Sequence, residues 1–231
     1  MSAQAMQIDM QNNGLQPAVT IIDDGVFRRI DDANGKPNNK LIAYVCFGNA
    51  GYYWHGSKLN EGKNWSIKNE IEFTAQEKAD YLAKILWAKQ QRAIEQERIH
   101  SECRLKAKQI WETSEQATAE HPYLIHKNIK PHHAKLYKGN LIIPVYDVAD
   151  TLHGLQFIDE NGVKKFLSGT SVKGNFSCIQ GDDSKPIHIC EGFATAATVA
   201  EITGATTVIA FSCGNLEPVV KTLSERLGGA K

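Results

Sequence analysis

The sequence predicts an α+β protein assembled from several small units, and three observations lead to this fold class. Short β-rich runs alternate with turn signals over residues 19–68. Residues 74–119 contain neither Gly nor Pro, which favours a long helix. From residue 185 the chain has an apolar strand–helix–strand–helix pattern. We therefore expect the following units in chain order: a disordered arm (1–18), a small β-rich module (19–72), a long helical connector (73–120), a basic segment with a β-meander (121–184) and a β-α-β-α segment (185–231).

The N-terminal part divides into an arm and a sheet. The first 18 residues are rich in Gln and Asn and only weakly apolar, which is typical of disorder. The β-rich runs that follow are separated by turn dipeptides such as Asp24-Gly25 and Asn34-Gly35, so a small antiparallel sheet is predicted, with Trp54 and Trp65 as core or edge aromatics. The runs are Val19–Ile22, Val26–Ile30, Leu41–Phe47 and Tyr52–His55.

The helical connector begins with Thr74-Ala-Gln-Glu77, which matches a capping box, and nothing breaks the helix before about Ala119. Its apolar spacing is good early and late, but the middle, 90–104, is mostly polar. Such a stretch is typical of a solvated strut or of a break between two helices, and a coiled-coil partner is a third reading. The apolar positions are Leu82, Ile85, Leu86, Ala107, Ile110 and Trp111.

The next block, 139–176, reads as a β-meander. Asn140–Tyr146, Thr151–Ile158 and Gly162–Leu167 are the predicted strands, and turn signals at Ala149-Asp150 and Glu160-Asn-Gly162 separate them. Pro144 lacks the backbone N–H that a ladder needs, so we expect its strand to be an edge strand or an irregular one.

Composition excludes several classes of protein. The 26 basic residues balance 26 acidic ones, so the total charge gives no sign of a nucleic-acid partner. The five cysteines are scattered without a CxxC pair, which argues for reduced thiols and against a disulfide framework or a Cys-rich zinc site. No secretory signal and no apolar run near ~20 residues is evident, so we expect a cytoplasmic protein that does not contact membranes.

Charge is nevertheless concentrated locally. Residues 121–138 contain four Lys, four His and no acid, which favours contact with a polyanion. His126, His132 and His133 could bind a metal, but adjacent histidines in a basic loop are more typical of surface or phosphate contacts. The alternative for the lysines is a solubilising face.

Two familiar motifs are incomplete. Gly169–Gly174 has the glycines of a phosphate loop, but Asn175-Phe176 stands where Lys-Ser/Thr is required. Ala210–Gly214 resembles a degenerate nucleophile elbow, yet no histidine follows His188, so a hydrolase triad in the usual chain order is impossible.

Glu191 is the most informative single residue. It stands where an apolar strand passes into a helix, and chemistry in parallel sheets gathers at the carboxyl ends of strands, beside helix N-termini. A carboxylate there suits a metal or phosphate site. It also suits a helix start, where it would complement the macrodipole by about 0.3–1 kcal/mol. From strand-end geometry alone the two readings stay open.

The residues around Glu191 resemble the first half of a Toprim domain, in the form carried by phage and plasmid DNA primases. The likeness lies in Cys190–Ala196, Val208–Phe211 and Gly214–Leu216. It extends upstream over roughly residues 20–231. The further matching segments are Asp24–Arg29, Gly35-Lys36, Gly48–Trp65, His121–Lys127, Leu141–Pro144, Gly154–Gln156, Lys164–Gly169 and Gly174–Phe176.

This resemblance implies roles for particular residues in RNA primer synthesis on single-stranded DNA during replication. It makes Glu191 the catalytic carboxylate and a Mg²⁺ ligand, and it makes Lys165, with Lys164 as its alternative, the phosphate contact. Gly192 would permit close backbone approach, and Asn215 would order the turn after the second strand.

The sequence departs from the family in one respect. Toprim enzymes bind Mg²⁺ through a later Asp-x-Asp, which this chain lacks, and one carboxylate seldom holds the ion usefully. The chain is therefore expected to be a piece of a longer primase, a short relative that kept nucleic-acid binding, or a protein that recruits other acids. Those acids would be Asp182-Asp183 or Asp23-Asp24. We expect primer synthesis by this chain to be weak or absent, and Mg²⁺ to bind only where further sequence supplies ligands.

The expected partners are single-stranded DNA and ribonucleotides. Lysines would follow the phosphate backbone, and Tyr123 or Tyr137 would stack on bases. A different class remains open: a non-enzymatic protein of a mobile element on an eroded Toprim scaffold, which binds nucleic acid, a replication protein or a host-defence protein through its polar helix. A Toprim nuclease is a third reading, and the upstream β-rich modules argue against it. The lysines are Lys127, Lys130, Lys135, Lys138, Lys164 and Lys173.

Overall fold

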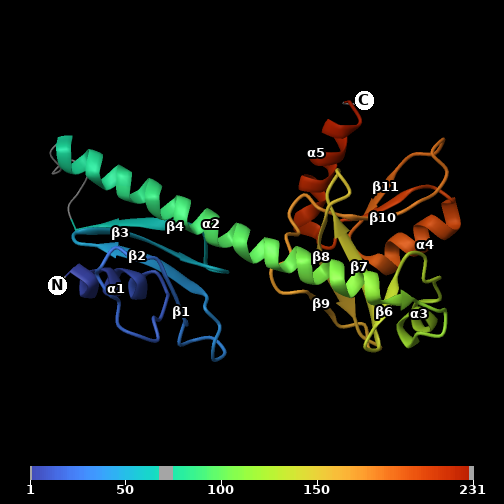
Figure 1. Ribbon diagram of the computed structural model, residues 1–231, viewed down its shortest axis with the longest axis horizontal. Coiled ribbons are helices and arrows are strands. Elements are labelled where there is room, and N and C mark those ends of the chain that lie inside the picture. The colour runs from blue at the N-terminus through green and yellow to red at the C-terminus, as the bar shows by residue number, and fades with distance from the viewer. Residues whose placement is uncertain (1, 68–74, 229–231) are drawn as a thin grey trace. The chain divides into compact units, whose positions relative to one another are not determined.

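The computed structural model describes residues 2–67 and 75–228 and confirms the α+β class. The chain divides into two compact units, Met1–Gln96 and Glu97–Lys231, which we describe separately (Figure 1). The predicted capping box at Thr74 lies outside the described residues. None of the described helices is long and apolar enough to cross a membrane.

The first unit contains a four-stranded antiparallel sheet in which each strand pairs with its chain neighbours. Three of the predicted β-rich runs are confirmed. The run Val19–Ile22 is not a strand, because side chains satisfy its backbone: Ile21 N–H donates to Gln7 and Ile22 N–H donates to Tyr44 Oη. The strands are β1 (Arg28–Ile30), β2 (Ile42–Phe47), β3 (Ala50–His55) and β4 (Leu59–Ser66).

The expectation of a disordered N-terminal arm is wrong, because residues Ser2–Asn12 form helix α1. Met6 and Met10 are spaced four residues apart, so they share one helix face, and both are fully buried against the sheet. Asp9 anchors the same helix by accepting a hydrogen bond from Tyr53 Oη at 2.6 Å. The polar composition concealed this helix because two methionines are enough to dock it.

The two tryptophans of the first unit differ in burial. Trp65 belongs to the core beneath α1, whereas Trp54 is half-buried on the other face of the sheet. The guanidinium groups of Arg29 and Arg92 lie 5.5 Å and 4.7 Å from the centre of the Trp54 ring. Arg29 lies in the sheet itself, whereas Arg92 lies in the long helix, so its cation–π contact attaches the first part of that helix to the sheet.

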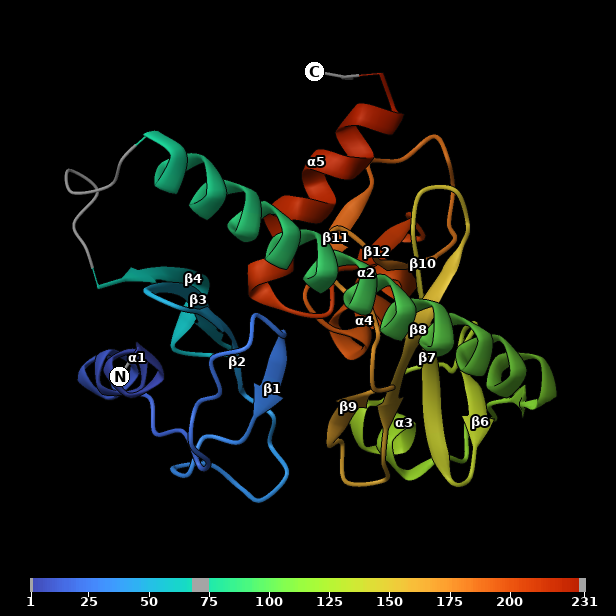
Figure 2. The same cartoon turned by 60° about the vertical axis from the view of Figure 1, so that its left-hand side comes forward.

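The long helix α2, Ala75–Thr113, is continuous, so of the readings of its polar middle the break between two helices is wrong. It ends at Thr113 rather than near Ala119, and Ser114 Oγ donates to the carbonyl of Ile110 at this end. In the second unit, Ala107 and Ile110 pack on a sheet face, which Figures 1 and 2 show beneath the C-terminal part of α2.

The second unit contains a five-stranded antiparallel sheet in chain order, and the predicted meander forms its last three strands. β7 is an interior strand and not an edge strand. However, the pairing of β7 with β6 covers only Asn140–Ile142 and stops before Pro144, and the register of β7 on β8 shifts between Val145 and Tyr146. The strands are β5 (Glu115–Gln116), β6 (Lys135–Tyr137), β7 (Asn140–Tyr146), β8 (Leu152–Ile158) and β9 (Lys164–Phe166).

The predicted β-α-β-α segment is confirmed as β11 (His188–Cys190), α4 (Phe193–Thr203), β12 (Thr207–Ile209) and α5 (Leu216–Arg226). β11 and β12 are parallel. β10 (Ser177–Ile179) covers the other edge of β12 in antiparallel pairing. Among the described residues β11 pairs with β12 alone.

Alternation along the meander gives its sheet two different faces. Ile142 and Leu155 contact the cluster beneath α2, whereas Leu141, Ile143 and Ile158 belong to the core that contains Phe193 of α4. This second face joins the meander to the segment that contains Glu191. A short helix, α3 (Pro122–Lys127), contributes Tyr123 and Leu124 to the same core.

Candidate functional site

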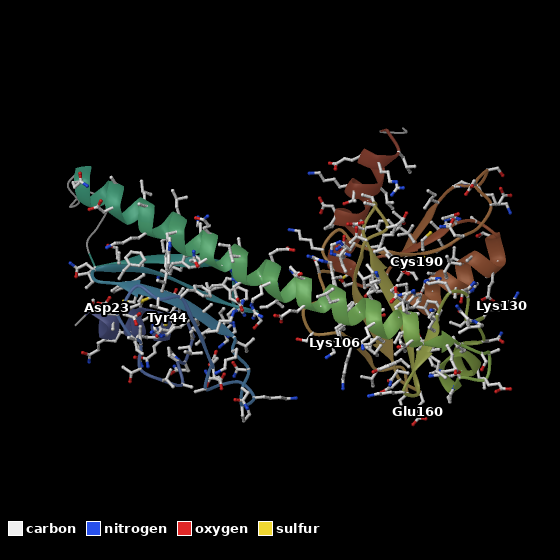
Figure 3. All side chains as sticks on the ribbon, viewed as in Figure 1. Asp23, Tyr44, Lys106, Lys130, Glu160 and Cys190 are labelled. Atoms are coloured by element: carbon white, nitrogen blue, oxygen red, sulfur yellow. The ribbon has the colours of Figure 1, made fainter. Side chains whose placement is uncertain are left out.

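Glu191 occupies the turn between β11 and α4. Cys190, labelled in Figure 3, is the last residue of the strand, and Gly192 is the N-cap of the helix. The Glu191 side chain is exposed, and within the described part of the chain it makes no hydrogen bond or ion pair. The structure confirms that Glu191 lies at the carboxyl end of the strand, and its role in binding a ligand stays a prediction.

Lys164 reaches the same turn from the meander. A Cβ atom added to Gly192 would lie 3.1 Å from Lys164 Nζ, so glycine leaves room for the ammonium group. Phe166, on the same face of β9, packs edge-to-face against Phe211 with ring centroids 5.7 Å apart. An ammonium group beside a helix N-terminus, where backbone N–H groups are unpaired, provides the chemistry of an anion site.

Lys165 points to the opposite face of the sheet. It pairs with Phe157, whose side chain packs in the cluster beneath α2. The structure thus places Lys164, rather than Lys165, at the Glu191–Gly192 turn. The role of Lys165 stays a prediction from the motif.

A hollow of about 510 Å³ opens between α3 and the β8–β9 turn, and we call it the α3 hollow. Its lining includes Tyr123, His126, Lys127, Glu160 and Lys164. Three of the predicted nucleic-acid contacts therefore converge, and Lys164 links the hollow to the Glu191 turn. The Tyr123 side chain is 3% exposed, and burial raises the pKa of its phenol. Its hydroxyl hydrogen-bonds no described residue, so it can donate to a ligand.

The other predicted lysines do not join this hollow. Lys135 Nζ donates to the carbonyl of Trp111 at 2.7 Å, and Lys138 lies over the ring of Tyr137. Lys173 lines a different hollow, together with Glu217 and other residues of α5. Lys130 lies at one end of α4, as Figure 3 shows, where its backbone N–H donates to Glu201. Because α4 rises about 1.5 Å per residue, this end is roughly 15 Å from Glu191.

Glu201 is exposed, but its carboxylate connects α4 to the segment before β6. It accepts hydrogen bonds from Lys130 N–H at 2.8 Å and from His132 Nε2 at 2.9 Å. Burial alone would raise the pKa of this carboxyl group, but these two partners outweigh it and the pKa is lowered. His133 turns inward to Ser177 instead, so the adjacent histidines do not share a ligand.

Asn215 is buried in the turn after β12, and its side chain is hydrogen-bonded to several backbone groups. Its Oδ1 accepts from Gly174 N–H at 2.8 Å, and its Nδ2 lies within 3.0 Å of the carbonyls of Val172, Asn175 and Ala210. The side chain therefore ties the loop after the meander to the end of β12, a contact that spans about forty residues of sequence.

Ala210–Gly214, the segment that resembles a nucleophile elbow, has an unusual backbone conformation. It lies at Phe211 and not at Ser212, the position of the nucleophile in such an elbow. Phe211 has φ +69°, a left-handed conformation that is costly for a bulky side chain, whereas Ser212 is extended. Burial of the Phe211 ring against Phe166 compensates for this conformation. Sequence reasoning missed this pair, since neither residue carries a chemical group that would mark a site.

The residues present do not by themselves fit a magnesium site. Within the described ranges no three His, Cys, Asp or Glu side chains gather closely enough to hold a metal ion. One acid of each pair considered as an extra ligand is engaged locally: Asp182 accepts from the backbone and hydroxyl of Ser184, and Asp24 pairs with Arg28. Glu191 would need ligands from outside the described residues.

The sequence is similar to proteins from Escherichia coli. One relative is 32% identical over 209 residues, which is 87% of this chain and 20% of the relative. Another is 32% identical over 174 residues, which is 72% of this chain and 12% of the relative. Both are named DNA primase TraC.

The similarity to DNA primase TraC supports a primase-type protein. The chain spans a fifth or less of the length of these relatives. No family model matches the sequence, and no solved structure matches it.

Proposed function

We propose that this chain is the nucleic-acid-binding part of a Toprim-type DNA primase, whose full-length form makes RNA primers on single-stranded DNA. The observation that carries the proposal is the meeting of Glu191, Gly192 and Lys164 at one strand end, in a chain similar to DNA primase TraC. Mg²⁺ would join this site only with acidic ligands additional to Glu191.

The residues of the site have distinct roles in this proposal. Lys164 and the N-terminus of α4 bind a phosphate next to the Glu191 carboxylate. Lys127 and the Tyr123 hydroxyl hold a neighbouring phosphate or sugar in the α3 hollow. Glu191 acts on the reacting group as a base or a ligand, and Asn215 positions the loop that approaches from the meander.

Salt titration of single-stranded DNA binding tests the phosphate contacts. We expect the affinity of this chain for a labelled oligonucleotide to fall steeply with salt, by a slope of about 0.7 per phosphate contact on a log–log plot. Lys164→Ala should reduce the slope by about one contact. Lys165→Ala is the matched control, because the two lysines are adjacent and both exposed but lie on opposite faces of β9. Fluorescence anisotropy provides the measurement.

Two results would contradict the proposal in different ways. A larger effect of Lys165→Ala than of Lys164→Ala would show that Lys165, the residue that the motif suggested, is the phosphate contact. Binding that is insensitive to salt, or no binding at all, would show that these lysines do not contact phosphates.

Primer synthesis by this chain alone is expected to be weak or absent, because one carboxylate rarely holds Mg²⁺ in a useful geometry. Incorporation of radiolabelled ribonucleotides on a single-stranded template measures it. Robust template-directed synthesis that needs Mg²⁺ would overturn this expectation. In that event Glu191→Gln should abolish the activity, and retained activity would remove Glu191 from the site.

A non-enzymatic role is the alternative, in which a protein of a mobile element uses α2 to bind a replication or host-defence protein. The observation in its favour is that Leu82, Leu86 and Trp87 are 46–66% exposed on this helix. Salt-insensitive binding of a protein partner, lost in Leu86→Lys, would support this role.

A further inference from the structure

A second hollow, of about 250 Å³, lies where β7, β10 and the end of α2 supply its walls. Trp111, Tyr146 and Phe176 line it, together with His133 and Ser177, and we call it the aromatic pocket. None of these residues belongs to the α3 hollow or to the Glu191 turn. Its three rings come from segments far apart in the sequence.

The rings are held in place before any ligand arrives. Tyr146 and Phe176 exchange two backbone hydrogen bonds, of 2.7 Å and 2.8 Å, so their positions are coupled. Lys135 Nζ lies 4.7 Å from the centre of the Trp111 ring and also donates to the carbonyl of the same residue. A pocket whose walls are already fixed loses little conformational entropy when it binds a ligand.

Apart from the Asp150 carboxylate, which also lines the aromatic pocket, the polar groups that face it are uncharged. His133 Nε2 lies 2.8 Å from Ser177 Oγ, and burial, with the adjacent His132, lowers the pKa of His133 to about 4. Burial, and then the charge of Asp150, raises the pKa of the Tyr146 phenol, which therefore keeps its proton. The Tyr146 hydroxyl hydrogen-bonds no other residue of the described chain. Flat walls with uncharged hydroxyl and imidazole groups, and a carboxylate rather than lysines, suit a heterocyclic base, whereas the lysines of the α3 hollow suit a phosphate.

The two tyrosines that the sequence suggested for base stacking are each engaged by the protein. The ring of Tyr123 is almost entirely buried in the core. Tyr137 packs in the cluster beneath α2, with its ring centroid 6.3 Å from that of Phe157. The aromatic pocket offers three other rings, and each of them is partly exposed.

The aromatic pocket also lies close enough to the Glu191 turn for one DNA strand to reach both. Ser177 pairs with Ile209, and Ile209 pairs with Cys190, the residue before Glu191. The three residues form one row across the sheet, so Ser177 and Cys190 are separated by two strand spacings, or roughly 10 Å. A strand with one base in the pocket could therefore place a nearby phosphate at the Glu191 turn.

We propose that the aromatic pocket binds one unpaired base of single-stranded DNA, by stacking against Tyr146 and Trp111. This inference rests on the proposed function and adds a base-binding site to its phosphate contacts. Selection among bases would fall to the Tyr146 hydroxyl and the Asp150 carboxylate, which both lie at the pocket.

Photocrosslinking tests the proposal with the full chain. An oligothymidylate with one 5-iododeoxyuridine is irradiated with the protein, and the adduct is mapped by mass spectrometry. We expect the adduct on Trp111, Tyr146 or Phe176. A second sample contains the free nucleoside 5-iododeoxyuridine at millimolar concentration, so that base binding is measured without any phosphate.

Matched variants separate stacking from folding. Tyr146→Leu should lower the crosslink yield about tenfold, which is the size expected for loss of one base–aromatic stack. Tyr146→Phe should retain most of the yield, because the ring remains. Trp87→Leu is the control, since Trp87 lies on α2 but outside the pocket. Circular dichroism checks that each variant is folded.

Each outcome decides between the two proposals. Oligonucleotide adducts that map only outside the pocket overturn the base site and leave the proposed function standing. Adducts from the free nucleoside in the pocket, without any oligonucleotide binding, support the base site and contradict the DNA-binding function. No adduct from either probe, or an unchanged yield in Tyr146→Leu, overturns the base site.

Discussion

Asn215→Ala is expected to lower the free energy of unfolding of the second unit by about 3 kcal/mol. The Asn215 side chain is 4% exposed and satisfies Gly174 N–H and backbone carbonyls from both the loop and the strand. Alanine leaves these buried groups without partners, and each unpaired group costs about 1–3 kcal/mol unless water enters. Urea unfolding followed by circular dichroism measures the loss.

Asn161→Ala is the matched control, because Asn161 is exposed in the β8–β9 turn and its side chain makes no hydrogen bond within the described chain. We expect it to change the stability by less than about 0.5 kcal/mol. If Asn215→Ala were as mild as the control, Asn215 would not hold the loop to the strand. The loop contains Lys173 and Gly174, so Asn215→Ala should also weaken DNA binding.

The second unit is expected to lose stability as the pH falls from 7 to 5, because His133 is held neutral. Burial lowers the pKa of its imidazole from 6.5 to about 4. Between these two values the unfolded chain binds a proton that the folded chain excludes, so lowering the pH favours unfolding. The stability that depends on neutral His133 is fully present above pH 6.5 and is lost as the pH approaches 4. At pH 5 the loss is about 2 kcal/mol.

The comparison of wild type with His133→Gln isolates this contribution from the seven other histidines. Glutamine is neutral at every pH, and its amide can replace the hydrogen bond to Ser177. The variant should therefore lose about 2 kcal/mol less than wild type between pH 7 and 5 in urea unfolding. Parallel pH profiles for the two proteins would show that His133 accepts its proton as readily in the folded state as in the unfolded chain.

Local patterns were sufficient to predict most of the elements. The meander strands, the long helix and the β-α-β-α segment follow from turn signals and apolar periodicity, which depend on neighbouring residues. The local pattern wrongly predicted disorder for the N-terminal residues, because α1 is stabilised by the packing of Met6 and Met10 against Tyr44 and Tyr53. Such a contact joins segments that are about forty residues apart and leaves no mark in the local pattern.

The position of Glu191 was determined by the sequence alone, because a strand-to-helix boundary is a local property. Its basic neighbour was not. Lys164 and Lys165 are adjacent, and only the register of β9 on β8 decides which of them faces Gly192. A shift of one residue would exchange the two, since side chains alternate between the faces of a sheet.

The dispersal of the predicted lysines and the assembly of the aromatic pocket have the same cause. Lys127 and Lys130 are close in sequence, but in the fold Lys127 lines the α3 hollow and Lys130 lies at the far end of α4. Trp111, Tyr146 and Phe176 are distant in sequence and meet only through sheet pairing and helix packing. The sequence by itself determined the elements and the acid at the strand tip. The tertiary structure decided which side chains lie near Glu191, because long-range packing sets the distances between residues that are far apart in the sequence.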